Sequence, residues 1–245
     1  MRKSISFTKA AWLSGLATVV LANVAARFGN AGGGVPSPFD ARPGDVAGYY
    51  ADHSTFTATS GYLYGLAAVC LVIFSVAVWD RLCRRERSEA RLWALVGMTG
   101  AAIYAVLLLI LGLLQLALVG VALRDGASSQ VVTGLAVVWA GAAVLLVPGS
   151  VPLLLGFGMA ARRSGAFSGL LCFFALCGAA LGVLPPPEVL GPLSPVAANL
   201  AFVLSEAQPW MLVFWVLGTA FVMRRTEIQA EQGEEAIAAA GDAGG

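Results

Sequence analysis

Six long apolar runs dominate the sequence and constrain its fold more than any other feature. A helix needs about 20 mostly apolar residues to cross the hydrocarbon core of a bilayer. Because backbone polar groups in lipid must be satisfied within the segment itself, each run is predicted to be an α-helix. We therefore expect an all-α, polytopic integral membrane helix bundle with six transmembrane helices, at residues 10–26, 57–79, 93–123, 131–159, 167–184 and 196–223.

The composition favours insertion into a membrane. Charged residues make up 12% of the chain, against about 25% in a typical soluble domain. Hydrophobic residues make up 58%, and a water-soluble globule with that fraction would leave large apolar patches exposed. The lipid bilayer is therefore the expected partner. The net charge of +1 and the dispersed basic residues give no indication of nucleic acid binding.

The positions of Lys and Arg predict the orientation. If the N-terminus is cytoplasmic, twelve of these residues fall in cytoplasmic segments, and only Arg27, Arg42 and Arg124 fall outside. This alternation follows the positive-inside rule. Arg also outnumbers Lys thirteen to two, which is typical of GC-rich bacterial genomes. The sequence thus predicts a multi-pass protein of the bacterial cytoplasmic (inner) membrane with the N-terminus and the C-terminus in the cytoplasm.

The first apolar run has a second interpretation. Its basic start, its short apolar stretch and the small residues near Ala26 also fit a cleavable signal peptide. We expect a retained span at 10–26, and N-terminal sequencing of the mature protein distinguishes the two interpretations.

The connections predict further structure. The outer segment 28–56 is expected to hold a short helix over Asp45–His53, with Asp45 as its N-cap. The third run has 31 residues, or about 46 Å of helix, so its outer end at Val119–Leu123 should project and cover that segment. The membrane domain is expected to span 1–225. The tail 226–245 has five acidic residues and no basic one, and we expect it to be solvated and poorly ordered.

Glycines and prolines within the runs predict how the helices pack. Gly178 and Gly182 form a G-x-x-x-G pattern, which lets a neighbouring backbone approach closely. Pro148 and Pro152 in the fourth run each remove a backbone donor and bend the helix. A bent structural helix and a gating hinge both fit this pair.

Glu206 is the one acidic residue inside an apolar run, where ionisable groups are costly. It lies 17 positions before Met223, or about 25 Å along a helix, in the outer third of a core about 30 Å thick. Ser205 and Gln208 lie beside it, and Gln115 in the third run is expected to form an interhelical hydrogen bond. Two interpretations stay open, a polar notch that binds a solute or a proton and a structural carboxylate near the outer interface. Both require the carboxylate to face the bundle or an outer cavity, not lipid.

No catalytic, cofactor or metal pattern emerges from the sequence. The single histidine, His53, follows Asp52, but one histidine supplies neither a three-ligand zinc site nor a catalytic triad. The cysteine spacing fits neither a disulfide framework nor a zinc site, with cysteines at positions 70, 83, 172 and 177. We therefore expect no enzyme activity, no cofactor and no metal.

Three stretches carry a resemblance that covers most of the chain. They are Gly44–Tyr62 running on to Trp79–Leu82, then Leu154–Gly158 followed by Arg163–Gly165, and Leu204–Glu206 leading into Trp210–Trp215. With these stretches the chain resembles a bacterial family of six-transmembrane-helix proteins that is defined only as a domain of unknown function. The resemblance implies a six-helix membrane fold with a retained first helix. It implies no established activity, so no catalytic residue is carried over.

Two kinds of function fit these observations. The first is a non-enzymatic regulatory or scaffold component whose partners are lipid, a second copy of the chain or another membrane protein. The alternative is a small-solute or proton-coupled transporter that uses an outer-leaflet polar notch at Glu206. Six spans without an inverted repeat argue against an ordinary secondary transporter.

Overall fold

The computed structural model describes residues 7–29, 34–84, 88–124, 126–184 and 195–242, and the regular structure in these ranges is entirely α-helical. The all-α prediction is confirmed. The helices are α1 (Phe7–Gly29), α2 (Pro43–Asp52), α3 (Ser54–Cys83), α4 (Ser88–Ala122), α5 (Ser129–Val144), α6 (Leu146–Gly149), α7 (Val151–Ser164), α8 (Gly169–Gly182) and α9 (Pro195–Asp242).

Four helical segments are long and apolar enough to cross a membrane, at Lys9–Gly29, Ser54–Cys83, Glu89–Ala122 and Ser129–Ser164. The last of these joins α5, α6 and α7. Apolar helix α8 is shorter, with 14 residues. Large apolar side chains lie exposed on the outside of the bundle, as Ile103 (45%), Leu113 (64%) and Phe173 (58%) illustrate. Such a surface suits lipid and not water, so the structure agrees with a membrane-embedded protein.

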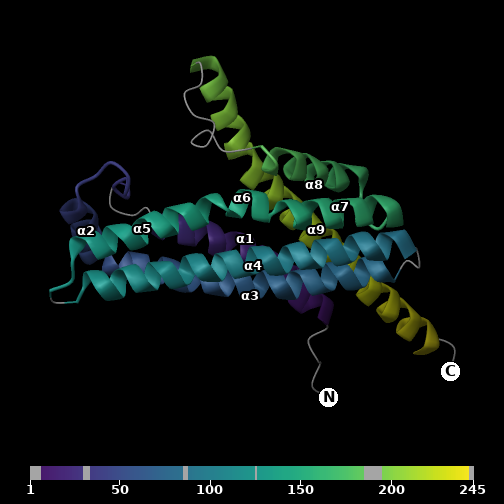
Figure 1. The fold of residues 1–245 in the computed structure, drawn as a ribbon. Helices are drawn as coiled ribbons and strands as arrows, with labels where there is room; N and C mark the ends of the chain where they lie inside the picture. The colour runs from purple at the N-terminus through teal and green to yellow at the C-terminus, as the bar shows by residue number, and fades with distance from the viewer. Residues whose placement is uncertain (1–6, 30–33, 85–87, 125, 185–194, 243–245) are drawn as a thin grey trace.

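Six helical segments close into a ring. Each packs against the next in the order α1, α3, α4, α7, α8 and α9, and α9 returns to pack against α1. Figure 1 shows α3, α4 and the α5–α7 run lying lengthwise, with α9 crossing them obliquely. Helix α1 thus fills the place between α3 and α9, and the first and last helices of the chain are neighbours.

The centre of the ring is filled by aromatic side chains. Trp215 of α9 is 2% exposed, and its ring stacks on Phe157 of α7 with centroids 5.8 Å apart. The edge of Phe74 from α3 meets the same indole at 6.1 Å. All charged side chains whose burial is described remain outside the buried core, so the middle of the bundle is neutral.

Two pairs of helices approach each other through glycine. A Cβ on Gly156 of α7 would lie 2.1 Å from the backbone nitrogen of Gly97 in α4, and a Cβ on Gly61 of α3 would lie 2.7 Å from the carbonyl oxygen of Gly112 in α4. No side chain fits at these positions, so glycine sets how closely α4 packs on both neighbours.

The predicted G-x-x-x-G pair also faces its neighbours. A Cβ on Gly178 would meet Met211 of α9 at 3.0 Å, and one on Gly182 would meet the carbonyl of Val147 at 3.2 Å. The pair therefore packs α8 within this chain.

Helix α2 covers the end of α4 and α5 away from the ring centre. Val46, Tyr49 and Tyr50 of α2 pack with Leu118 of α4 and Val132 of α5 in a second apolar cluster. The C-terminal end of α4 therefore contacts the short helix of the segment that precedes α3.

The short helix predicted over Asp45–His53 is present with one correction. It begins at Pro43, its N-cap is Arg42, and Asp45 lies within the first turn without capping it. Proline at the first helical position has a backbone angle already suited to a helix, which explains the earlier start.

The fourth predicted span is interrupted, and the last helix is longer than expected. Breaks at Leu145 and Ser150 separate α5, α6 and α7 around the two prolines that predicted a bend. Helix α9 continues to Asp242 with Pro209 inside it. The tail that we expected to be poorly ordered is thus helical as far as that residue, because Ala, Glu and Gln are strong helix formers.

Candidate functional site

Gln208 is the predicted polar residue with the most definite contact. Its side chain is 2% exposed, and its Nε2 donates a hydrogen bond to the Oγ of Ser150, 2.5 Å away. The Ser150 hydroxyl in turn donates to the carbonyl of Val147 at 2.7 Å. This chain of contacts joins α9 to the break between α6 and α7, where Pro152 cannot donate a backbone hydrogen bond.

The contact with Ser150 also bears on depth. Ser150 lies 12 positions before Arg162, which corresponds to about 18 Å along a helix. If Arg162 marks the membrane surface, Ser150 lies just past the midplane of a core about 30 Å thick. Gln208 shares that depth because it is hydrogen-bonded to Ser150. Helix α9 crosses the bundle obliquely, so depth changes less per residue along it than along an upright helix (Figure 1).

Glu206 and Ser205 belong to α9, but their side chains lie outside the described residues. The prediction that the Glu206 carboxylate faces the bundle or an outer cavity therefore stays a prediction.

Gln115 lies in a different cluster, at the C-terminal end of α1. It is 3% exposed, and a Cβ on Gly29 would lie 3.1 Å from its Nε2 and 3.2 Å from the Oγ of Ser60. Ser60 donates to the carbonyl of Ala25 at 2.7 Å, and the Tyr49 hydroxyl donates to the carbonyl of Gly29 at 3.2 Å. The Tyr49 hydroxyl thus satisfies the Gly29 carbonyl, one of the last four of α1 that have no intrahelical donor, while Ser60 bonds to α1 one turn earlier.

The Gln115 cluster retains one unsatisfied acceptor. Its Oε1 has no hydrogen-bond partner among the described residues, and an unpaired buried acceptor costs about 1–3 kcal/mol. The four predicted polar residues therefore do not form one site, because Gln115 packs with α1 and α3 whereas Gln208 packs with α6 and α7. Ser60 and Ser150 were missed by the sequence analysis, although hydroxyl residues within apolar runs commonly bond across membrane helices.

The outer segment holds the lone histidine. The His53 ring stacks on Tyr49 with centroids 4.5 Å apart, and its Nδ1 lies 3.0 Å from the Tyr49 carbonyl. Burial, together with the neighbouring Tyr49, raises the pKa of Tyr50 to about 12. These groups are held in packing contacts around the joint between α2 and α3, and they lack the nucleophile and base arrangement of a catalytic site.

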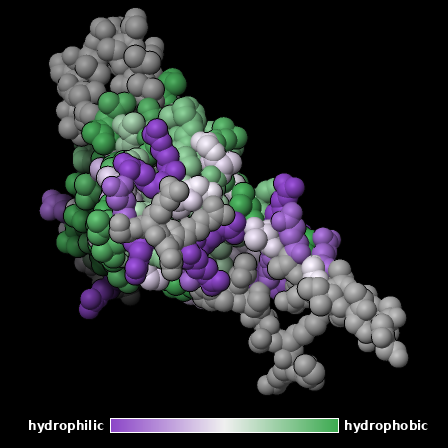
Figure 2. All heavy atoms as spheres, turned by 90° about the vertical axis from the view of Figure 1, so that its right-hand side faces the viewer, coloured by the Kyte–Doolittle hydropathy of each residue, from purple (hydrophilic) through white to green (hydrophobic). Residues whose placement is uncertain are grey.

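Basic side chains gather at the end of the bundle opposite α2. Arg163 of α7 forms an ion pair with Glu89 of α4 at 2.5 Å. Arg81 of α3 lies over the Phe167 ring at 5.3 Å and donates to the Thr226 hydroxyl at 3.2 Å. Figure 2 looks onto this end and shows hydrophilic side chains on it, with hydrophobic ones along the flank. The alternate connections that carry Arg in the sequence thus meet at one end of the molecule.

The described part of the chain contains no group of side chains suited to bind a metal ion. No cluster of three or more His, Cys, Asp or Glu residues occurs there that would hold an ion. The four cysteines are free thiols. Both observations concern residues 7–29, 34–84, 88–124, 126–184 and 195–242 only.

Comparison with known proteins gives no relative, since no family model, no curated protein and no solved structure matches this chain. The resemblance to a six-helix family of unknown function therefore stays a prediction.

Proposed function

We propose that this protein is a non-enzymatic scaffold or regulatory component of the bacterial cytoplasmic membrane, with six spans and both termini in the cytoplasm. The observation that supports this function best is the filled centre of the helix ring. Trp215 lies between Phe74 and Phe157 where a conduit would have to pass, and the buried polar side chains whose burial is described are neutral hydroxyls and amides.

Closure of the ring supports six spans. Helix α8 has 14 residues, or about 21 Å, which is shorter than a hydrocarbon core of about 30 Å. It nevertheless packs between α7 and α9, and it exposes Phe173 at 58%. A short span is accommodated when the bilayer thins around it or when flanking side chains reach the interface.

The single basic end supports the orientation. Cytoplasmic segments of membrane proteins are enriched in Lys and Arg. Arg81 lies in the last turn of α3 and Arg163 in the last turn of α7, and hydrophilic side chains gather at the end of the bundle that Figure 2 faces. We assign this end to the cytoplasm.

Labelling of Cys83 tests the orientation. Cys83 lines a surface hollow of about 430 Å³ with Arg91 at the basic end, so a cytoplasmic end predicts protection from an impermeant thiol reagent in intact cells. A variant that keeps only Cys83, with the other cysteines changed to Ala, should react only after lysis. Changing Cys83 to Ala as well and adding Thr55→Cys moves the single thiol to the opposite end, where reaction should precede lysis. The reverse pattern would contradict the orientation.

Photo-cross-linking in cells tests the scaffold function. A photoreactive residue in place of exposed Phe173 should form a discrete adduct with a second copy or with another membrane protein. The same residue in place of Phe157, which is 0% exposed, is the control and should form none. Protein-dependent solute or proton flux in reconstituted vesicles, without any adduct from position 173, would overturn the proposal.

One observation favours transport as the second candidate. A helix broken inside the membrane, with a buried polar contact at the break, is the usual construction of a transporter binding site, and Ser150 with Gln208 provides such a contact. Under this alternative Glu206→Gln abolishes flux while expression is unchanged. If Glu206 is structural instead, Glu206→Gln should lower the stability of the protein, and neither the parent nor the variant should show flux.

A further inference from the structure

A groove between α1 and α9 at the basic end changes in character along its length. Its inner part has a volume of about 430 Å³ and is mostly apolar, with Leu16, Leu217 and Phe221 among its lining residues and Arg224 at its end. An adjoining hollow of about 300 Å³ shares Phe221 and Arg224 and continues along α9 to Gln229 and Gln232. The lining of the groove therefore changes from apolar side chains at one end to arginine and glutamine side chains at the other.

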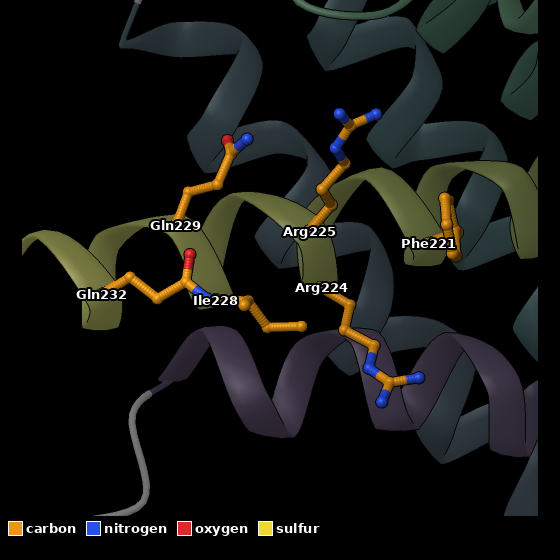
Figure 3. A pocket seen from close by; sticks show the side chains of 6 residues that line it. All are labelled: Phe221, Arg224, Arg225, Ile228, Gln229 and Gln232. Atoms are coloured by element: carbon orange, nitrogen blue, oxygen red, sulfur yellow. The ribbon is translucent and has the colours of Figure 1, made fainter.

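The cationic part is held in place by α1. The Arg224 guanidinium lies over the Trp12 ring at 5.1 Å, and the Trp12 indole donates to Glu227 at 3.2 Å. Figure 3 shows the two side chains diverging, with Arg224 reaching toward α1 and Arg225 extending from the opposite side of α9. Neither arginine forms an ion pair with a residue of the described ranges, so both guanidinium groups retain donors for an anion. The acidic Glu227 lies three positions after Arg224, and its contact with Trp12 orients it toward α1.

We propose that this groove binds one anionic phospholipid, with an acyl chain against Leu16, Leu217 and Phe221 and the phosphate at the Arg224 guanidinium. A phospholipid has the same change from apolar to anionic along its length. Basic pockets between transmembrane helices near the membrane surface are suited to such head groups. Trp12 lies at the level where an amphipathic ring is most stable, between hydrocarbon and water.

Binding of defined lipids to the purified full-length protein tests this site. Native mass spectrometry in detergent, with phosphatidylglycerol or phosphatidylcholine added, reports the bound fraction of each. A basic residue beside an anionic lipid contributes about 1 kcal/mol, so Arg224→Gln should weaken phosphatidylglycerol binding about fivefold. Arg225→Gln removes a guanidinium that extends from the other side of α9, and it should weaken binding less than Arg224→Gln. Phosphatidylcholine should bind weakly to every variant.

Two further variants separate this site from general attraction to the basic end. Arg84→Gln removes an exposed arginine of the same end that pairs with Asp80 outside the groove, and it should leave binding unchanged. Leu16→Trp fills the apolar part while leaving both arginines, and it should reduce lipid binding.

The proposal is overturned if the two lipids bind equally or if Arg84→Gln weakens binding as much as Arg224→Gln. It is also overturned if Leu16→Trp leaves binding intact, or if inorganic phosphate at the lipid concentration displaces the lipid. Thermal unfolding of each variant in the same detergent confirms that it is folded.

Discussion

Gly100 on α4 faces the backbone of α7 more closely than any side chain allows. A Cβ at Gly100 would lie 2.1 Å from the backbone nitrogen of Leu153 and 2.5 Å from the carbonyl carbon of Pro152. Because both obstacles are backbone atoms, no rotamer change relieves the contact. To restore a separation of 3.0 Å, the shortest that real Cβ contacts show, α4 and α7 must move apart by about 0.9 Å.

We therefore expect Gly100→Ala to destabilise the bundle by about 1–3 kcal/mol, the usual cost of overpacking. The same substitution at Gly120, on the same helix, provides the control. A Cβ there meets nothing within 4 Å, and replacing glycine by alanine inside a helix stabilises it by about 0.5–1 kcal/mol.

The assay is reversible unfolding of the purified protein in mixed micelles as the fraction of denaturing detergent rises. The reasoning requires changes of opposite sign for the two variants. If Gly100→Ala is as stable as the parent, or if both variants shift in the same direction, the close approach of α4 and α7 does not hold.

Three other predictions follow from contacts described above. A double-mutant cycle of Gln208→Leu and Ser150→Ala should give a coupling free energy of about 0.6 kcal/mol, the average for hydrogen bonds between membrane helices, and a coupling of zero would exclude their bond. The pKa of Tyr50 is raised from 10.0 to about 12. The contribution of its neutral hydroxyl to the free energy of unfolding should therefore be full below pH 10.0 and lost as the pH rises through about 12. Unfolding midpoints across this range, compared with those of Tyr50→Phe, measure how much stability is lost. Mass analysis of the mature protein should find α1 retained, since it fills the ring between α3 and α9, and a mass that lacks it would show cleavage.

Length and hydropathy predicted which segments are helical, because each apolar run must satisfy its own backbone in lipid. The prolines at 148 and 152 predicted the interruption of the fourth run, and the short outer helix was expected within two residues of its true start. The fifth run forms a shorter helix than its apolar length predicted, since α8 has only 14 residues.

The sequence did not predict which helices pack together or which of their faces are buried. Two tryptophans of α9 show why. Trp210 is 54% exposed and Trp215 is 2% exposed, although both lie in the same apolar run. A helix that is apolar on every side carries no periodicity to tell its buried face from its lipid-facing one. The centre of the bundle could therefore not be located before the structure.

The polar residues show the same division. Gln208 and Gln115 stood out because amides are rare among apolar neighbours, and both are buried. Their partners did not stand out, since Ser150 and Ser60 are small hydroxyl residues with no distinguishing spacing. The groove at Arg224 was equally hidden, because its second wall, Trp12, comes from the other end of the chain.

The neighbouring positions of α1 and α9 determine when this protein can finish assembling. Helix α1 leaves the ribosome before α9, so a nascent chain that still lacks α9 is an open arc. During that interval the Trp12 and Gly15 side of α1 faces lipid or the insertion machinery. Contacts between segments so far apart in the sequence form slowly, because the entropy of the chain between them must be lost before the contact forms. A chain that stalls before α9 keeps this edge of the bundle open, and packing of α9 on α1 closes it.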